Sequence, residues 1–127
     1  MLRAATRMLA SKRVLIVGSG GQVGLDLIPL LRDRGETVRC CDIIPRPPGL
    51  SAEVGWDHLD VTNAGDVQRF IAEAEPDRIY HLAAMLSATG EKHPNRCFDV
   101  NLLGTRNVLD AAVAAPVKPQ IIFTSTI

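Results

Sequence analysis

The sequence lacks the features that mark several classes of protein. Among its 127 residues, 14 basic side chains balance 14 acidic ones, so no excess charge favours a nucleic acid or a membrane surface. No apolar run approaches the roughly 20 residues that cross a bilayer. The composition, 46% hydrophobic and 22% charged, is typical of a soluble globular protein, and the length suits one domain. We therefore expect no nucleic-acid partner and no membrane partner.

Cysteine is also scarce, with only Cys40, Cys41 and Cys97. Neighbouring residues on a strand point to opposite faces, so Cys40 and Cys41 are poorly placed to share a disulfide or a metal ion. The histidines show no ligand-like spacing with these cysteines. We expect buried free thiols, a reducing compartment and no metal site.

The N-terminal segment, residues 1–12, differs in composition from the rest, with basic side chains such as Arg3 and Arg7 and no carboxylate. Arg-rich leaders without acidic residues are typical of mitochondrial import. An unstructured tail, or a start at Met8, would explain the same composition and leave the protein in the cytoplasm. We expect a mitochondrial leader over residues 1–12 and one folded domain over residues 13–127.

Short apolar segments rich in β-branched residues alternate with segments of helical periodicity. This alternation predicts βαβ units with right-handed crossovers, and hence a doubly wound α/β fold of Rossmann type that ends after its fifth strand. The residues expected on one side of the first helix are Val23, Leu27, Leu30 and Leu31. The expected strands are 14–17, 37–42, 56–59, 78–82 and 120–124. The first expected helix covers 22–34, the second is capped by Asn63 and ends near residue 74, and the third covers 94–115. A loop is expected over 83–93.

Three glycines, Gly18, Gly21 and Gly24, lie between the first expected strand and the first expected helix. The first permits a sharp turn, the second lets a diphosphate approach the backbone, and the third lets the helix pack closely on the strand. The expected helix begins at Gln22, followed by Val23. The free N–H groups of these two residues and the positive end of the helix dipole favour the binding of phosphate there. The pattern in this context predicts a dinucleotide site.

An acidic residue, Asp42, ends the second expected strand 18 positions after Gly24. Its carboxylate can accept hydrogen bonds from both hydroxyls of an adenine ribose and would repel a 2′-phosphate, which predicts NAD rather than NADP. Ile43, the next residue, is also expected to contact the cofactor. Arg46 lies close enough in sequence to weaken the repulsion between Asp42 and a 2′-phosphate. The alternative is that Asp42 is only an exposed charge at the end of a strand.

A second acidic element, Asp60-Val61, follows the third expected strand. Asp60 can accept a hydrogen bond from an adenine amino group while the amide of Val61 donates to the ring. Asp60 can instead cap the next helix. His81 titrates near neutral pH, but we expect it to bond a backbone carbonyl rather than to act as a general base.

The segment His81–Ala84 resembles the fourth strand end of the extended short-chain dehydrogenase/reductases, that is, the NAD-dependent epimerase/dehydratase family. Residues Asp99–Leu109 resemble the next helix of that family, and the likeness extends over residues 13–127. It implies a Rossmann-type NAD-binding domain whose full-length form pairs as a homodimer. The residues that it places at the cofactor are Leu82, Ala83, Ala84 and Asn101.

Within this family, Tyr80–Lys92 and Ser125–Ile127 are similar to the short-chain type of L-threonine 3-dehydrogenase. The likeness implies an enzyme that oxidises L-threonine to 2-amino-3-oxobutanoate with NAD, so that its partner is a small molecule, an amino acid rather than a nucleotide sugar. It gives Thr126 a catalytic role, holding the reacting hydroxyl, and it places Ser87 and Ser125 at the substrate. A nucleotide-sugar epimerase or dehydratase and a non-catalytic NAD-sensing module remain alternatives.

The same resemblance implies a catalytic Tyr-x-x-x-Lys pair. The only tyrosine is Tyr80, and the fourth residue after it is Ala84. We therefore expect the pair to follow Ile127 and this chain alone to be an inactive fragment.

Overall fold

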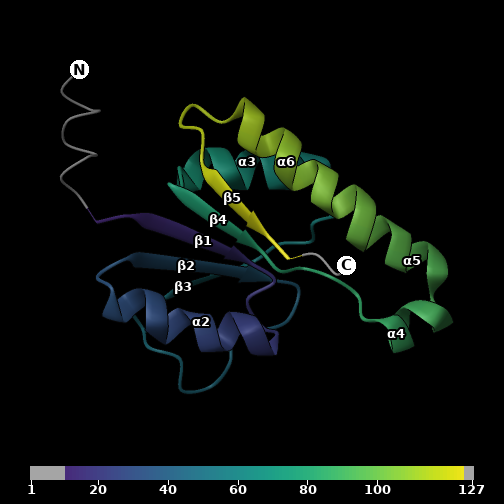
Figure 1. Cartoon of the computed structure of the whole chain (residues 1–127), viewed down its shortest axis with the longest axis horizontal. Coiled ribbons are helices and arrows are strands. Elements are labelled where there is room, and N and C mark those ends of the chain that lie inside the picture. The colour runs from purple at the N-terminus through teal and green to yellow at the C-terminus, as the bar shows by residue number, and fades with distance from the viewer. Residues whose placement is uncertain (1–10, 125–127) are drawn as a thin grey trace.

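The chain folds around one parallel β-sheet, described in a computed structural model over residues 11–124 (Figure 1). The five strands lie in the order β3-β2-β1-β4-β5, and all their pairings are parallel. This confirms the predicted Rossmann-type α/β fold. The strands are β1 (Arg13–Val17), β2 (Thr37–Asp42), β3 (Gly55–His58), β4 (Arg78–His81) and β5 (Gln120–Phe123).

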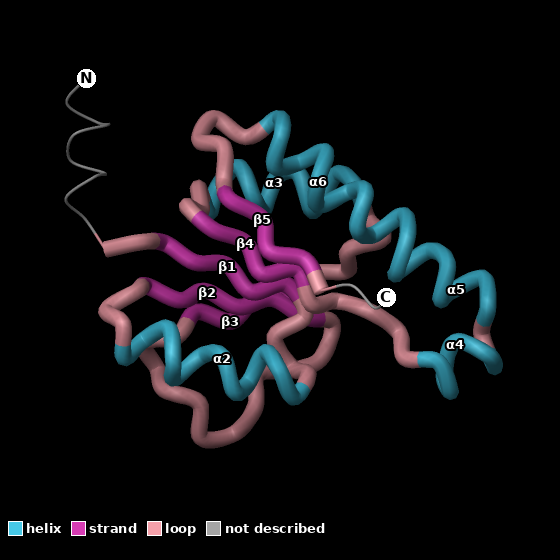
Figure 2. Tube along the Cα trace, viewed as in Figure 1, coloured by secondary structure: helices cyan, strands magenta, loops and turns pink. Residues whose placement is uncertain are grey.

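Helices cover both faces of the sheet: α2 lies on one face, and α3 and α6 lie together on the other (Figure 2). Alternation along β1 divides the core between the faces. Val14 and Ile16 pack toward α2, whereas Leu15 and Val17 pack toward α3 and α6. The helical segments are α2 (Gln22–Asp33), α3 (Ala64–Ala74), α4 (Ser87–Lys92), α5 (Pro94–Phe98), the π-helical η1 (Asp99–Gly104) and α6 (Thr105–Ala114).

The cysteines follow the same alternation. Cys40 packs in the cluster beneath α2 and Cys41 in the cluster on the opposite face, both fully buried and free of disulfides. This confirms that they point to opposite faces. Cys97 is also free but only half-buried, so the expectation that all three thiols are buried was wrong for this residue.

The buried face of α2 differs from the expected one. Gly24, Ile28 and Leu31 face the core, whereas Val23 and Leu30 are each 61% exposed. The turn before α2 packs closely against Gly24, on the buried side of the helix. The apolar side read from the sequence was therefore wrong at Val23 and Leu30.

Helix α3 forms as its sequence predicts. The side chain of Asn63 accepts a hydrogen bond from the amide of Asp66 and caps the helix. Val67 and Ile71 are completely buried beneath it. The helix ends at Ala74 and is followed by Glu75, which has a left-handed backbone with φ of 43°.

Beyond the carboxyl ends of the strands, the short helix α4 forms within the expected loop 83–93 (Figure 1). The expected helix 94–115 is confirmed as a helical run from Pro94 to Ala114, but its middle, η1, has a π-helical pattern that was not expected. A Cβ on Gly104, the last residue of η1, would lie 2.6 Å from a methyl group of Val61. The close approach of the Val61 side chain to the backbone of Gly104 is a tertiary contact, which helical periodicity does not reveal.

Two groups of predictions lie outside the described residues. They are residues 1–10 of the expected leader, and Ser125 and Thr126 near the end of the chain. Across residues 11–124, no helix is both long enough and apolar enough to span a membrane.

Candidate functional site

The turn between β1 and α2 needs glycine at its first position. Gly18 has a φ of 85°, and its amide donates a hydrogen bond to the carbonyl of Cys41 at 2.9 Å. A Cβ at Gly18 would lie 2.4 Å from the backbone nitrogen of Ala83. The turn therefore fits between β2 and the segment after β4 only because the side chain is absent.

Ser19 holds this turn from within, a role that the sequence analysis missed. The residue is completely buried. Its hydroxyl donates to the carbonyl of Ile16 at 2.6 Å and accepts from the amide of Cys41 at 3.2 Å. The hydroxyl thus links β1 to β2 directly beneath the turn.

The other two predicted glycines have opposite surroundings. A Cβ on Gly24 would lie 2.6 Å from the carbonyl oxygen of Ser19, so the helix packs on the turn itself rather than on the strand as expected. A Cβ on Gly21 would meet nothing closer than the carbonyl oxygen of Gly18 at 3.9 Å. Gly21 caps α2 without a side-chain hydrogen bond, and no acceptor within residues 11–124 takes the amides of Gln22 or Val23. The free amides of Gln22 and Val23 therefore lie beside the open space at Gly21.

Asp42 lies beside the turn, as predicted. Its Oδ2 accepts a hydrogen bond from the amide of Gly20 at 2.8 Å. Its Oδ1 accepts from the amides of Ile43 at 2.6 Å and Ile44 at 3.3 Å. A carboxylate oxygen has two acceptor positions, so Oδ2 keeps one for a ligand.

Arg46 is directed into its own loop. Its guanidinium donates to the carbonyl of Val54 at 2.6 Å, that of Leu50 at 3.0 Å and that of Ser51 at 2.5 Å. These bonds hold the segment between β2 and β3. The expected effect of Arg46 on the charge of Asp42 is therefore weakened, because the loop carbonyls hold the guanidinium.

A cavity of about 410 Å³ opens at the carboxyl ends of the strands, between the glycine turn and η1. Nine of the predicted cofactor residues border it: Gly18, Gly21, Asp42, Ile43, Asp60, Val61, Leu82, Ala83 and Ala84. Met85, Thr89, Arg96 and Val100 also border it and were not predicted. We call this space the nucleotide cavity. Gln22, Val23, Gly24, Ser87 and Asn101 are not among the residues that line it.

Asp60 accepts hydrogen bonds from two directions. Its Oδ1 accepts from the amide of Thr62 at 3.0 Å and from its hydroxyl at 2.8 Å, and its Oδ2 accepts from Arg96 at 3.0 Å. Burial raises the pKa of Asp60, but the hydrogen bonds from Thr62 and Arg96 outweigh it and leave the pKa below its usual value. Because Asn63 caps α3, the alternative that Asp60 is the helix cap was wrong.

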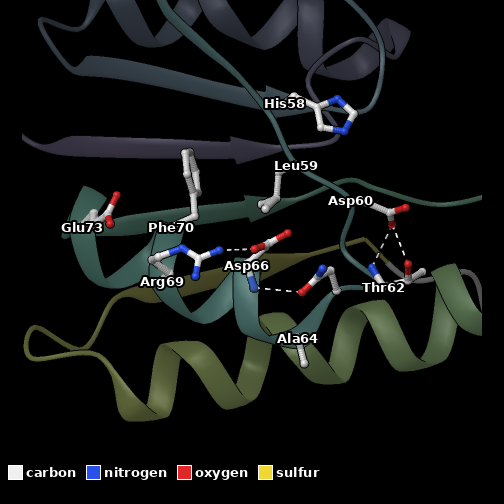
Figure 3. A pocket seen from close by; sticks show the side chains of 10 residues that line it. His58, Leu59, Asp60, Thr62, Ala64, Asp66, Arg69, Phe70 and Glu73 are labelled. Carbon is white, nitrogen blue, oxygen red and sulfur yellow. Dashed lines mark hydrogen bonds and ion pairs between the residues drawn. The ribbon is translucent and has the colours of Figure 1, made fainter.

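A larger, open depression of about 730 Å³ lies on the outer side of Asp60, along α3 (Figure 3). Its carboxylates are largely engaged: Asp66 pairs with Arg69, and Asp60 bonds to Thr62. Within the described part of the chain, no group of three or more His, Cys, Asp or Glu side chains could hold a metal ion.

Asn101 contacts the backbone rather than the nucleotide cavity. Its Oδ1 accepts from the amide of Met85 at 2.7 Å, and its Nδ2 donates to the carbonyl of Met85 at 3.1 Å and to Sγ of Cys97 at 3.3 Å. Asn101 therefore supports one wall of the cavity through Met85. Ser87 is exposed at the start of α4 and borders a separate shallow surface that also includes Asn101.

His81 is almost completely buried, with 2% of its surface exposed. Its Nε2 lies 3.0 Å from the hydroxyl of Thr105, which in turn donates to the carbonyl of Asn101 at 2.7 Å. The expected carbonyl partner was therefore wrong, because a hydroxyl lies in between. Burial lowers the pKa of His81 to about 4, so the ring is neutral near pH 7. Nδ1 has no partner within residues 11–124.

The cavity fits a dinucleotide. The open edge at Gly21 and the free amides at the start of α2 suit a diphosphate, and Asp42 offers an acceptor to the adjoining ribose. The cavity lies outside the carboxyl ends of parallel strands, next to the point where the strand order reverses at β1. Fold and site together define a dinucleotide-binding domain of Rossmann type.

Comparison with known sequences identifies the family within that class. Residues 14–127 match the NAD dependent epimerase/dehydratase family. The chain belongs to this family, and its cofactor is NAD.

Individual relatives within and near this family differ in activity. A 3-beta-hydroxysteroid dehydrogenase from Mycolicibacterium neoaurum is 36% identical over 123 residues, which cover 90% of this chain and 32% of the relative. The structure is similar to a nucleoside-diphosphate-sugar epimerase from Agrobacterium tumefaciens, with a TM-score of 0.78, 30% identity and coverage of 93% and 38%. It is also similar to an L-threonine dehydrogenase from Cupriavidus necator, with a TM-score of 0.69, 34% identity and coverage of 79% and 32%. The chain thus spans about 32% of the length of the curated relatives that it matches.

Proposed function

We propose that this chain is the NAD-binding part of an oxidoreductase that oxidises L-threonine to 2-amino-3-oxobutanoate. In this reaction C3 of threonine loses a hydride to NAD, and the hydroxyl on C3 loses its proton to a base. The nucleotide cavity, with Asp42 beside the glycine turn, is the observation that carries the assignment of hydride transfer to NAD. The resemblance of Tyr80–Lys92 and the similarity to the enzyme from Cupriavidus necator support threonine as substrate.

The diphosphate is proposed to lie against Gly21, where the amides of Gln22 and Val23 are free to donate. Gly18 and Gly24 keep the turn compact enough to present those amides. This arrangement uses the helix dipole as well as hydrogen bonds, because the positive end of α2 is directed at the phosphates.

The adenosine half is proposed to lie between β2 and β3. Asp42 accepts from the ribose hydroxyls with its free position on Oδ2, and Ile43 packs beside the sugar. Asp60 accepts from the adenine amino group, and the amide of Val61 donates to the ring. The side chain of Asn107 donates to the carbonyl of Val61 at 2.8 Å, which anchors the backbone on the C-terminal side of this residue.

The nicotinamide half is proposed to run along Leu82, Ala83 and Ala84, which form the opposite wall. Asn101 acts on that wall through its two hydrogen bonds to Met85. Thr126 remains proposed as the residue that holds the reacting hydroxyl. Ser87 and Ser125 remain proposed substrate contacts, and the homodimer and the mitochondrial location remain predictions.

A second candidate is an enzyme that acts on nucleotide sugars. It is favoured by the similarity to the epimerase from Agrobacterium tumefaciens, which covers 93% of this chain. Both candidates need the same NAD cavity, so the residues described here serve either one. The substrates distinguish them.

Two measurements test the proposal. Calorimetry should show that the chain binds NAD more tightly than NADP, and Asp42→Ala should weaken NAD binding by about 1–3 kcal/mol. Asp26→Ala, which removes an exposed carboxylate from α2, is the matched control and should leave the affinity unchanged. Equal affinities of wild type and Asp42→Ala would remove Asp42 from the site.

The complete protein that carries this sequence should form NADH with L-threonine and should not interconvert UDP-glucose and UDP-galactose. The opposite pair of results would replace the threonine reaction with the nucleotide-sugar reaction. Failure with both substrates, with NAD binding intact, would reject both substrates and leave the cofactor assignment standing.

A further inference from the structure

Helix α5 lies beyond the carboxyl ends of the strands (Figure 1). The side chain of Arg96 extends from α5 to the loop between β3 and α3. Arg96 donates through one nitrogen to Oδ2 of Asp60 at 3.0 Å. Its other terminal nitrogen lies 3.4 Å from the hydroxyl of Thr62. Both partners lie in the loop between β3 and α3, so the contact joins segments 34 and 36 residues apart in sequence.

The position of this ion pair relates it to the nucleotide cavity. Asp60 and Arg96 both line the cavity, Asp60 from the β3–α3 loop and Arg96 from α5. Asp60 also borders the open depression along α3 (Figure 3). The ion pair therefore stands between the cavity and the open surface, at the end of the cavity proposed for adenine.

The ion pair is suited to opening and closing. The side chain of Arg96 is 44% exposed and that of Asp60 is 34% exposed. Water competes for ion pairs with this exposure, so each one contributes little to stability and can break without unfolding the domain. Asp60 keeps its orientation when the pair opens, because Thr62 still donates two hydrogen bonds to Oδ1.

We propose that Arg96 is a positioning residue that latches α5 across the adenine end of the bound dinucleotide through its ion pair with Asp60. The latch rests on the proposed NAD site. When the pair is closed, α5 and the β3–α3 loop are held together on either side of the base. When it opens, that end of the cavity joins the open depression and the nucleotide can leave.

The first test measures NAD dissociation from the chain by stopped flow. Arg96→Met should raise the dissociation rate about two- to fivefold, the range expected for a half-exposed ion pair. Arg96→Lys keeps the charge, so its dissociation rate should lie between that of the wild type and that of Arg96→Met. Arg106→Met is the matched control, since Arg106 pairs with Asp110 on the exposed side of α6 and lies outside the cavity. Added salt should speed dissociation from the wild type and have less effect on Arg96→Met, because the ion pair is screened.

A double-mutant cycle separates the latch from a direct contact between Arg96 and the nucleotide. In an Asp60→Asn background, Arg96→Met should produce little further change, because its charged partner is gone. If Arg96→Met has its full effect in that background, Arg96 acts without Asp60 and the latch is overturned. Equal dissociation rates for wild type and Arg96→Met overturn it as well.

Hydrogen exchange without nucleotide gives an independent result. Amides of α5 should exchange faster in Arg96→Met than in the wild type, while those of β1 should not change. Unchanged exchange in α5 would overturn the latch even if NAD binds as proposed. If the wild-type chain binds no NAD, the proposed cofactor site fails instead, and exchange in α5 still reports whether Arg96 holds the helix.

Discussion

Acid should destabilise this domain through one buried side chain, His81. The ring is 2% exposed, it stacks on Phe123 with centroids 5.9 Å apart, and its Nδ1 has no partner within the described chain. A proton on Nδ1 would place an unpaired charge in the core. Burial accordingly lowers the pKa of His81 from 6.5 to about 4.

The direction and the size of the effect follow from these two values. Between pH 6.5 and about 4, the unfolded chain binds a proton at His81 that the folded chain does not bind. Lowering the pH through this window therefore favours unfolding, and the stability is fully present again once the pH has risen through the window to above 6.5. At about 1.4 kcal/mol for each pH unit, the full loss is roughly 3 kcal/mol. This loss is a large part of the free energy of unfolding of a typical domain, which is about 5–15 kcal/mol.

Urea denaturation at a series of pH values measures this loss. His81→Gln removes the titrating group and keeps an amide that can bond to Thr105, so its free energy of unfolding should fall less steeply with acid than that of the wild type. His58→Gln, at an exposed position on β3, is the control and should follow the wild-type curve. Parallel curves for wild type and His81→Gln would refute the reasoning.

Three further substitutions test the site. Gly18→Ala should destabilise the fold by about 1–3 kcal/mol in urea denaturation, because its Cβ would lie 2.4 Å from the nitrogen of Ala83; an unchanged midpoint would contradict the close approach. Gly21→Ala should unfold at the same temperature as the wild type yet bind NAD less tightly in calorimetry, since its Cβ meets only open space; unaltered affinity would place the diphosphate elsewhere. Asn101→Ala should speed hydrogen exchange at the amide of Met85 by about five- to tenfold, the effect of losing a hydrogen bond worth about 1 kcal/mol or slightly more.

The sequence predicted the elements whose signals are local. The alternation of strands and helices, the glycine turn and the cap at Asn63 each depend on neighbours within a few residues, and the structure confirms them. The position of Asp42 also depends on the parallel pairing of β2 with β1, which brings the last residue of β2 back beside the turn, and the strand pattern predicted that pairing.

Features that depend on contacts between distant segments were missed or mistaken. The rotation of α2 places Ile28 and Leu31 against strand residues such as Ile16, and the count of apolar residues along the helix does not reveal this packing. The π-helical stretch η1 coincides with the close approach of the Val61 side chain to Gly104.

The amino-acid sequence by itself determined that the chain forms a parallel α/β sheet with a glycine turn after its first strand and a carboxylate, Asp42, at the end of the second. Only the tertiary structure decided that His81 bonds to Thr105 and that Arg96 meets Asp60 at the edge of the cavity. The physical reason is that hydrogen bonds and packing at short range leave a periodic pattern in the sequence. A contact between residues 36 positions apart depends instead on the path of the backbone between them.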